Sequence, residues 1–288
     1  MVKQCKAYDY SRLPQGKLPA PGTEWFVSTK YDGHYVQICI NLFTEQVTMY
    51  TSGGKPFVNM PMADELLKAF NDKSAKELFG NNIILEGEYL GQAMGKLGDR
   101  GEAAVITTMR KEYERGIDSH RPNDKLMIFD FVNTKAQFHE RARWLSVLAE
   151  LLRVTEARCV GVVQNMITTQ PFKIAQELIA DGWEGVIAKS PYHTYIPGKR
   201  VANAFKIKER KSKELVCVDV TEGLGKYEGK IGALVLEDEH GKTYQVGSGL
   251  SDEVRNMDKE DLYGKAVTIS YERYTDTFIQ PVIIAIGD

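Results

Sequence analysis

Alternating apolar and polar residues dominate the early part of this chain. Residues 25–54 read WFVSTKYDGHYVQICINLFTEQVTMYTSGG, and turn residues separate the runs. Successive side chains of a strand point to opposite faces of its sheet, so an alternation with period two indicates strands with one buried face. We therefore expect several antiparallel strands here, after an irregular lead that contains Pro14, Pro19 and Pro21.

Helix-like and strand-like segments alternate along the next stretch. Apolar residues recur at helical spacing in three segments, 62–79, 138–154 and 172–182. Further runs are typical of strands, at 82–91, 126–133, 183–190 and 203–210. The pattern predicts an α+β domain in which helices cover antiparallel sheets.

The pattern changes after the charged stretch KERKSKE. Residues 215–288 hold several short strand-like runs, a hairpin turn at 238–241 and one short helix at 251–257. Several short strands with one small helix predict a small closed β-barrel of the OB type. Since domain boundaries fall in exposed, polar linkers, we expect two domains, residues 1–211 and 212–288.

Composition narrows the class of protein. Of the 288 residues, 43% are apolar and 26% are charged, as in ordinary soluble globular proteins. The four cysteines lack CxxC spacing, which argues against a zinc site or a disulfide scaffold and fits a reducing compartment. We find no signal peptide and no apolar run near the roughly 18 residues of a membrane span, so we expect a cytoplasmic monomer that binds no membrane. The formal net charge of −2 means that binding to a polyanion must come from local basic patches.

A lysine at a turn is the first candidate for chemistry. Lys30-Tyr31-Asp32-Gly33 follows a strand-like run, and Asp-Gly is typical of turns. Two interpretations are open at this point. The lysine could be a solvated side chain on a hairpin turn, or it could be a nucleophile held beside a carboxylate.

Three further polar groups lie on strand-like runs. Glu86 and Glu88 flank a glycine, and residues i and i+2 of a strand point to the same face. Glu184 precedes an apolar run that ends in a lysine, and Lys206 and Lys208 share one strand face. Each pattern alone is also compatible with a solvated sheet edge, since burying an unpaired charge is costly.

The order of these motifs is more specific than any one of them. Lys-x-Asp-Gly, Glu-Gly-Glu, an aromatic-Asp-aromatic run at 129–131, Glu-Gly-Val-Ile-Ala-Lys and Lys-x-Lys follow one another before the small barrel. In this order the sequence resembles the covalent nucleotidyltransferases, most closely the small ATP-dependent DNA ligases of viruses and phages. Residues 225–255, GKYEGKIGALVLEDEHGKTYQVGSGLSDEVR, resemble the start of a DNA ligase OB domain.

The resemblance implies a nucleotidyltransferase (adenylation) domain followed by an OB-fold domain, and a ligase that serves DNA repair or replication. Lys30 would attack the α-phosphate of ATP and carry AMP on its amine. The AMP would pass to the 5′-phosphate at a nick in duplex DNA, and the 3′-hydroxyl would displace it. A free amine has a pKa of about 10.4, so neighbouring cations, namely Lys206, Lys208 and Mg²⁺, would favour its neutral form.

Other roles follow from the same resemblance. Glu88 matches the acid that contacts the ribose, and Phe129 matches the aromatic residue that stacks on adenine. Glu184 matches an acid that helps to hold the metal, and we expect Glu88 to contribute as well. Asp32 matches the turn aspartate near the reacting ends, and Ser28, on the preceding strand, is expected to line the nucleotide site.

Three positions where the family has arginine differ in this chain. His34 follows the first motif, Ser52 stands in the Ser-Arg-x-Gly pattern of the next strand, and Gln280 lies in a C-terminal segment that is usually basic. Arginine binds phosphate with two hydrogen bonds, so these differences leave open how a 5′-phosphate is held. We expect other residues, several of them in segment 95–121, to take over. The predicted DNA contacts are His34, Lys55, Arg100, Arg110, Lys111, Lys211 and Lys213.

Related activities remain as alternatives. Only 29 residues precede Lys30, too few for the extra N-terminal domain of NAD-dependent ligases, which favours ATP. An RNA ligase or a capping-type guanylyltransferase would use the same lysine, and a catalytically impaired nucleic-acid end-binding protein would fit the missing arginines. The short connection between Val220 and Ile231 predicts no long hairpin that encircles DNA.

Overall fold

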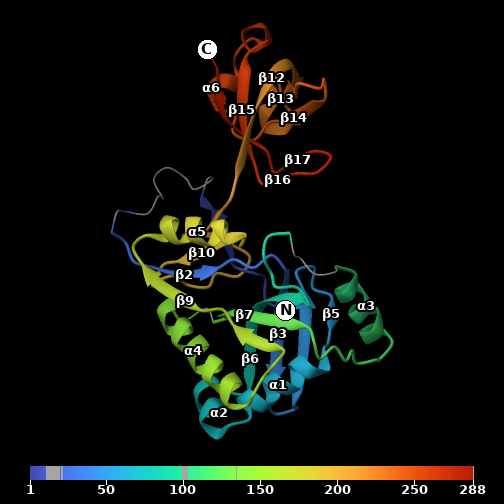
Figure 1. The fold of residues 1–288 in the computed structure, drawn as a ribbon, viewed down its shortest axis with the longest axis vertical. Helices are drawn as coiled ribbons and strands as arrows, with labels where there is room; N and C mark the ends of the chain where they lie inside the picture. The colour runs from blue at the N-terminus through green and yellow to red at the C-terminus, as the bar shows by residue number, and fades with distance from the viewer. Residues whose placement is uncertain (11–19, 21, 99–102, 134, 288) are drawn as a thin grey trace. The chain divides into compact units, whose positions relative to one another are not determined.

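The computed structural model describes residues 1–10, 20, 22–98, 103–133 and 135–287. The chain divides into two compact units, Met1–Lys208 and Glu209–Asp288 (Figure 1). The sequence pattern predicted the boundary three residues later, after residue 211. Among the helices of the described ranges, none is long and apolar enough to cross a membrane.

A six-stranded sheet forms the larger part of the first unit. Its strands lie in the order β5-β4-β3-β6-β7-β8, and all neighbours are antiparallel except β7 and β8. The strands span His34–Asn41 (β3), Gln46–Thr51 (β4), Pro56–Phe57 (β5), Asn82–Gly91 (β6), Lys125–Phe131 (β7) and Val160–Val162 (β8).

Helices cover this sheet because their apolar faces match its apolar strands. The four helices are Met60–Phe70 (α1), Lys73–Phe79 (α2), Ala103–Glu114 (α3) and Phe138–Val154 (α4). Leu66 of α1 and Leu148 of α4 join Ile38 and Leu85 of the sheet in one buried core. Figure 1 shows α1 and α4 against one region of the sheet and α3 apart from them.

The helix predicted over 62–79 is two helices. Asp72 separates them, and its carboxylate accepts the N–H groups of Ser74 (2.9 Å) and Ala75 (3.2 Å) at the start of α2. An aspartate at this position satisfies donors that a new helix leaves without intrahelical partners. The break could have been read from the Asn71-Asp72 pair.

A second, five-stranded sheet completes the first unit. Its order is β1-β11-β10-β2-β9, with β1 and β11 parallel. The strands span Lys6–Asp9 (β1), Trp25–Thr29 (β2), Asn165–Thr168 (β9), Gly185–Lys189 (β10) and Arg200–Lys208 (β11). Helix α5 (Pro171–Ala180) packs on it through Ala175, which shares a core with Trp25 and Phe205.

The second unit contains a five-stranded sheet and a small two-stranded hairpin. The sheet order is β14-β13-β12-β15-β18, and the hairpin joins β16 and β17. The strands span Lys211–Glu222 (β12), Ile231–Glu237 (β13), Thr243–Val246 (β14), Ala266–Tyr271 (β15), Arg273–Tyr274 (β16), Phe278–Ile279 (β17) and Val282–Ile286 (β18). A one-turn helix, Asp252–Arg255 (α6), follows β14, and a single turn of 3₁₀-helix, Gly225–Tyr227, lies in the short connection from β12 to β13.

The prediction of a closed barrel is wrong in one respect. Within the described residues, the end strands β14 and β18 do not pair, so the sheet is open. Beyond the end of β14, the Ile283 N–H donates one hydrogen bond to Ser248 O (2.8 Å). Gly249 follows with φ +94°, and a Cβ there would lie 2.2 Å from Ile283 O. Only glycine fits this close approach of the two backbones at a positive φ.

Candidate active site

A cavity of about 260 Å³ lies in the first unit and collects residues from both of its sheets. Strands β1, β2, β10 and β11 of the five-stranded sheet form some of its walls, and β3, β6 and β7 of the six-stranded sheet form the others. Several residues predicted to bind a nucleotide line it, namely Ser28, Lys30, Glu88, Phe129 and Lys206. Residues distant in the sequence are thus brought together around one cavity.

Lys30 begins the turn after β2 and is fixed by backbone and side chain. Its N–H donates to Gly185 O (2.9 Å), and its ammonium forms an ion pair with Glu184. The other oxygen of Glu184 lies 3.6 Å from Lys208 Nζ. The side chains of Lys30, Glu184 and Lys208 are 22%, 12% and 7% exposed. One carboxylate therefore bridges two nearly buried lysines, which excludes the interpretation of Lys30 as a solvated turn lysine.

Gly185 explains how Glu184 comes so close to β11. Its φ is +137°, and a Cβ at this position would lie 2.0 Å from the carbonyl oxygen of Ile207. Only glycine fits such an approach. Gly185 pairs with Lys208 in the register of β10 and β11, so the adjacent Glu184 carboxylate reaches the lysine pair.

The two lysines of β11 share a face, as the strand period predicts. Lys206 lines the cavity, and Ile207, on the opposite face, packs against the core under α5. Strand β11 lies between β1 and β10, so it is not a sheet edge. The interpretation of this pair as a solvated edge is therefore wrong.

Asp32, which was predicted to lie near the reacting ends, is buried beside the segment that carries Lys30. It is only 5% exposed, does not line the cavity, and accepts the Gly98 N–H at 3.0 Å. Its own N–H donates to Gly95 O at 2.9 Å. Asp32 therefore holds segment 95–98 against the turn of Lys30.

The same turn contacts β6 through Gly33. A Cβ on Gly33 would lie 2.8 Å from Glu88 Cγ, and the Gly33 N–H donates to Glu88 Oε1 at 3.2 Å. Because no side chain intervenes, Glu88 stands directly beside the turn that carries Lys30.

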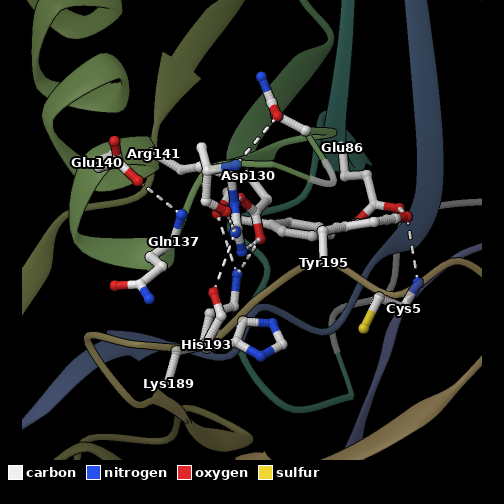
Figure 2. A network of polar contacts seen from close by, with 12 residues as sticks. Cys5, Glu86, Asp130, Gln137, Glu140, Arg141, Lys189, His193 and Tyr195 are labelled. Atoms are coloured by element: carbon white, nitrogen blue, oxygen red, sulfur yellow. Dashed lines mark hydrogen bonds and ion pairs between the residues drawn. The ribbon is translucent and has the colours of Figure 1, made fainter.

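A buried polar network that sequence reasoning missed forms one wall of the cavity (Figure 2). Tyr35 donates its hydroxyl to Glu86 at 2.6 Å, and Tyr195 donates to the same oxygen at 2.5 Å. The Cys5 N–H donates to the Tyr195 hydroxyl at 3.1 Å. Burial raises the pKa of Glu86 to about 7, although both tyrosines oppose the shift. The only sequence signal was the i, i+2 spacing of Glu86 and Glu88, which both line the cavity.

Asp130 anchors the neighbouring part of this wall. Arg141 donates from Nε to Asp130 at 2.8 Å, and Lys189 Nζ lies 2.8 Å from its other oxygen (Figure 2). Burial alone would raise the pKa of Asp130, but Lys189 and Arg141 together hold it at about 2. Lys189 Nζ, at the end of β10, also lies 5.5 Å from the ring centroid of Phe129, so the ring predicted to stack on adenine has a cation beside it.

The predicted DNA contacts are scattered over both units. His34 begins β3, Lys55 is exposed beyond β4, and Arg100 lies outside the described residues. On α3, Arg110 lies 3.9 Å from Glu114, whereas Lys111 is exposed. The two remaining ones belong to the second unit: Lys211 is exposed at the start of β12, and Lys213 pairs with Glu239 at 2.7 Å.

Two carboxylates, Glu88 and Glu184, were predicted to hold a metal ion. Among the described residues, no group of three or more His, Cys, Asp or Glu side chains could hold a metal ion. Magnesium, however, keeps several waters and uses one or two carboxylates together with substrate phosphates. Glu88 and Glu184 fit that use, because each carboxylate flanks the turn of Lys30.

Comparisons with known proteins agree along the chain. The family model "ATP dependent DNA ligase domain" matches residues 11–208, and the model "DNA ligase OB-like domain" matches residues 222–279. A DNA ligase of Methanococcus aeolicus is 26% identical over 278 residues, covering 89% of this chain and 45% of the relative. A DNA ligase 1 of Korarchaeum cryptofilum is 28% identical over 179 residues, covering 59% of this chain and 32% of the relative. The chain thus spans less than half the length of these curated relatives.

Solved structures share the fold. A structure described as a study of DNA binding with a minimal scaffold by Lig E DNA ligases matches with TM-score 0.62 and 18% identity, covering 99% of each chain. The ATP-dependent DNA ligase of bacteriophage T7, in complex with ATP, matches with TM-score 0.55 and 14% identity, covering 99% of this chain and 98% of its own. The expected α+β nucleotidyltransferase domain followed by an OB-like domain is confirmed.

Proposed function

Because the chain belongs to the family of ATP-dependent DNA ligase domains, we propose that it seals 3′-hydroxyl/5′-phosphate nicks in duplex DNA with ATP. The observation that carries the proposal is the arrangement of Lys30, which lines the cavity and shares the Glu184 carboxylate with Lys208. The protein acts as a cytoplasmic monomer, with an adenylation domain and an OB-like domain.

The first step is nucleotide transfer to Lys30. Its Nζ attacks the α-phosphorus of ATP, an N–P bond forms, the P–O bond to pyrophosphate breaks, and the amine loses a proton. Lys206 and Lys208 stabilise the charge that develops on the phosphate, since cations already fixed in place need no reorganisation when that charge appears. Phe129 stacks on the adenine, and Glu88 binds the ribose.

Glu184 holds the nucleophile in place through its ion pair with the Lys30 side chain. An amine attacks only as the free base, so Lys30 must give up its proton before the transfer. A bound magnesium ion supplies positive charge for the phosphates, and Glu184 and Glu88 are the residues that would hold it.

The remaining steps transfer AMP to DNA and join the strand. The 5′-phosphate at a nick attacks the phosphorus of lysyl-AMP, and Lys30 leaves as the amine. The 3′-hydroxyl then attacks the activated 5′-phosphate and releases AMP. Asp32 holds the turn that presents Lys30 during both transfers.

The test is a covalent labelling experiment. The protein is incubated with α-labelled ATP or GTP, and the labelled protein is then chased with nicked DNA or nicked RNA. We expect label from ATP, no label in Lys30→Ala, and sealing of a pre-adenylylated nick by that variant. Full labelling of Lys30→Ala would contradict the assignment, and label from GTP or transfer only to RNA would favour the capping or RNA-ligase alternative.

A further inference from the structure

Four basic residues gather in a second cavity that the proposed reaction has not used. This cavity, about 390 Å³, is lined by Lys3, Lys6, Lys199 and Arg200, together with Ser52, and contains no acidic residue among its described lining. All four cations are exposed. We call this cavity, with its four cations, the basic groove. Ser52 is the position where related sequences were expected to carry a phosphate-binding arginine.

The basic groove is built by the fold and not by chance proximity of long side chains. The buried amide of Gln37 on β3 accepts from the Val2 N–H (2.7 Å) and donates to the Val2 carbonyl (2.9 Å). The Lys6 N–H donates to Lys199 O (2.8 Å), where β1 begins to pair with β11. The backbone of the first residues is therefore held between β3 and β11, which places Lys3 and Lys6 beside Lys199 and Arg200.

Two of its members are held more closely. The Lys3 side chain packs on Gly198, where a Cβ would lie 3.2 Å from Lys3 Cδ. Arg200 donates to the Ala7 carbonyl at 2.5 Å, and its guanidinium carbon lies 5.8 Å from the Tyr8 ring centroid. Positive charge is thus presented at restricted positions, which lowers the entropic cost of binding an anion.

The charge of the groove is not neutralised by neighbours. Within the described ranges, no ion pair involves Lys3, Lys6, Lys199 or Arg200. Segment 95–121 differs, because Arg110 faces Glu114 and Arg121 lies 3.7 Å from Glu112. Four cations without acids attract a dianion more strongly than cations that already face carboxylates.

The groove adjoins the nucleotide cavity. Four residues line both spaces: Gln4, Lys6, Tyr35 and Arg200. An anion in the groove therefore lies beside the space that holds the proposed nucleotide. The chemical species needed there is a phosphate monoester, because the second transfer brings a strand end with a terminal phosphate to lysyl-AMP.

We propose that the basic groove binds the terminal 5′-phosphate of the nicked strand and replaces the arginine that is absent at Ser52. This inference rests on the proposed function. A 5′-phosphate carries up to two charges, and the groove offers four cations of which one, Arg200, can bind two of its oxygens. Backbone phosphodiesters and the phosphates of ATP are the competing sources of the same chemistry.

The experiment compares nicked duplexes that carry a 5′-phosphate or a 5′-hydroxyl at the nick. Variants Lys3→Ala and Lys199→Ala are chosen because neither residue lines the nucleotide cavity. We expect each to lower the affinity ratio of the two duplexes by about fivefold, the size of one exposed charge pair, and the double variant to lower it by more than tenfold. Lys73→Ala is the matched control, because that lysine on α2 is 90% exposed and pairs only with Glu77 at 3.9 Å.

Each result has a distinct meaning. If the groove variants lose affinity equally for both duplexes, the groove binds backbone phosphates. If they lose labelling by ATP while the affinity ratio of the two duplexes is unchanged, the groove binds ATP. Either outcome overturns the proposal. A smaller ratio in Arg110→Ala but not in the groove variants would assign the phosphate to segment 95–121. Wild-type protein that takes no label from ATP contradicts the proposed function itself. If the wild-type protein takes label from ATP but the groove variants keep the full affinity ratio, only the proposal for the groove is overturned.

Discussion

Replacing Glu86 by glutamine should make the protein less sensitive to alkaline pH. The side chain is 2% exposed, and its carboxyl accepts hydrogen bonds from Tyr35 and Tyr195. The pKa of this group is about 7 in the folded protein and 4.5 in the reference state. Glutamine keeps the acceptor oxygen for both tyrosines and cannot ionise. Glu86→Gln therefore resembles the protonated wild-type side chain.

The size and sign of the effect follow from linkage. A raised pKa of an acid means that the folded state binds the proton more tightly than the unfolded state. Its contribution is fully present below about pH 4.5, is lost as the pH rises to about 7, and stays lost above that. The pKa difference corresponds to roughly 3 kcal/mol, at about 1.4 kcal/mol per unit.

The assay is urea unfolding followed by tryptophan fluorescence at pH 5 and pH 8. We expect Glu86→Gln to exceed the wild type in free energy of unfolding by about 3 kcal/mol at pH 8 and by much less at pH 5. Glu77→Gln, whose side chain is 70% exposed, should show no such dependence on pH. An equal difference between Glu86→Gln and the wild type at both pH values would refute the reasoning.

Five further substitutions test the site and its surroundings. Lys206→Ala and Lys208→Ala should each slow labelling by ATP about 10²–10³-fold, as expected for the loss of one fixed donor to a developing anion. Lys211→Ala should mainly weaken DNA binding and flatten its salt dependence in titrations. If all three variants behave alike, the lysine pair does not belong to the site. Arg141→Met should cost about 3–5 kcal/mol in urea unfolding, because it leaves a buried carboxylate with one cation fewer, and a neutral result would show that this ion pair is dispensable. Phe129→Ala should raise the KM for ATP in labelling kinetics several-fold more than it lowers kcat, since stacking on a base is worth about 1–3 kcal/mol, and an unchanged KM would reassign the ring to core packing.

Local patterns predicted a large part of the site. The period of a strand put Glu86 with Glu88 on one face, and both line the cavity. The same rule put Lys206 and Lys208 together on β11. The Asp-Gly pair marked the end of β2, although no hairpin forms there, because β2 and β3 belong to different sheets. These features depend on neighbours in sequence, so a single sequence contains them.

Features that depend on distant pairing were not predictable in the same way. Strand β1 was expected to be part of an irregular lead, yet it pairs with β11 almost the whole length of the first unit away. Tyr195 reaches Glu86 across 109 positions. The sheet of the second unit is open because β14 and β18 do not pair within the described residues, and that absence of pairing is also a relation between distant segments. Hydrophobic periodicity shows which face of a strand is buried, but it does not show which distant strand becomes its neighbour.

The fixing of the first residues by Gln37 has a practical consequence for handling the protein. Met1 lies against the turn after β4, where a Cβ on Gly54 would be 3.3 Å from Met1 Cε. An affinity tag fused ahead of Met1 would therefore emerge beside Ser52, at the rim of the basic groove. A polyhistidine tag there would add titratable charge next to the groove, and proteolytic trimming of the first six residues would remove two of its lysines. Purification handles for binding measurements therefore belong at the other terminus.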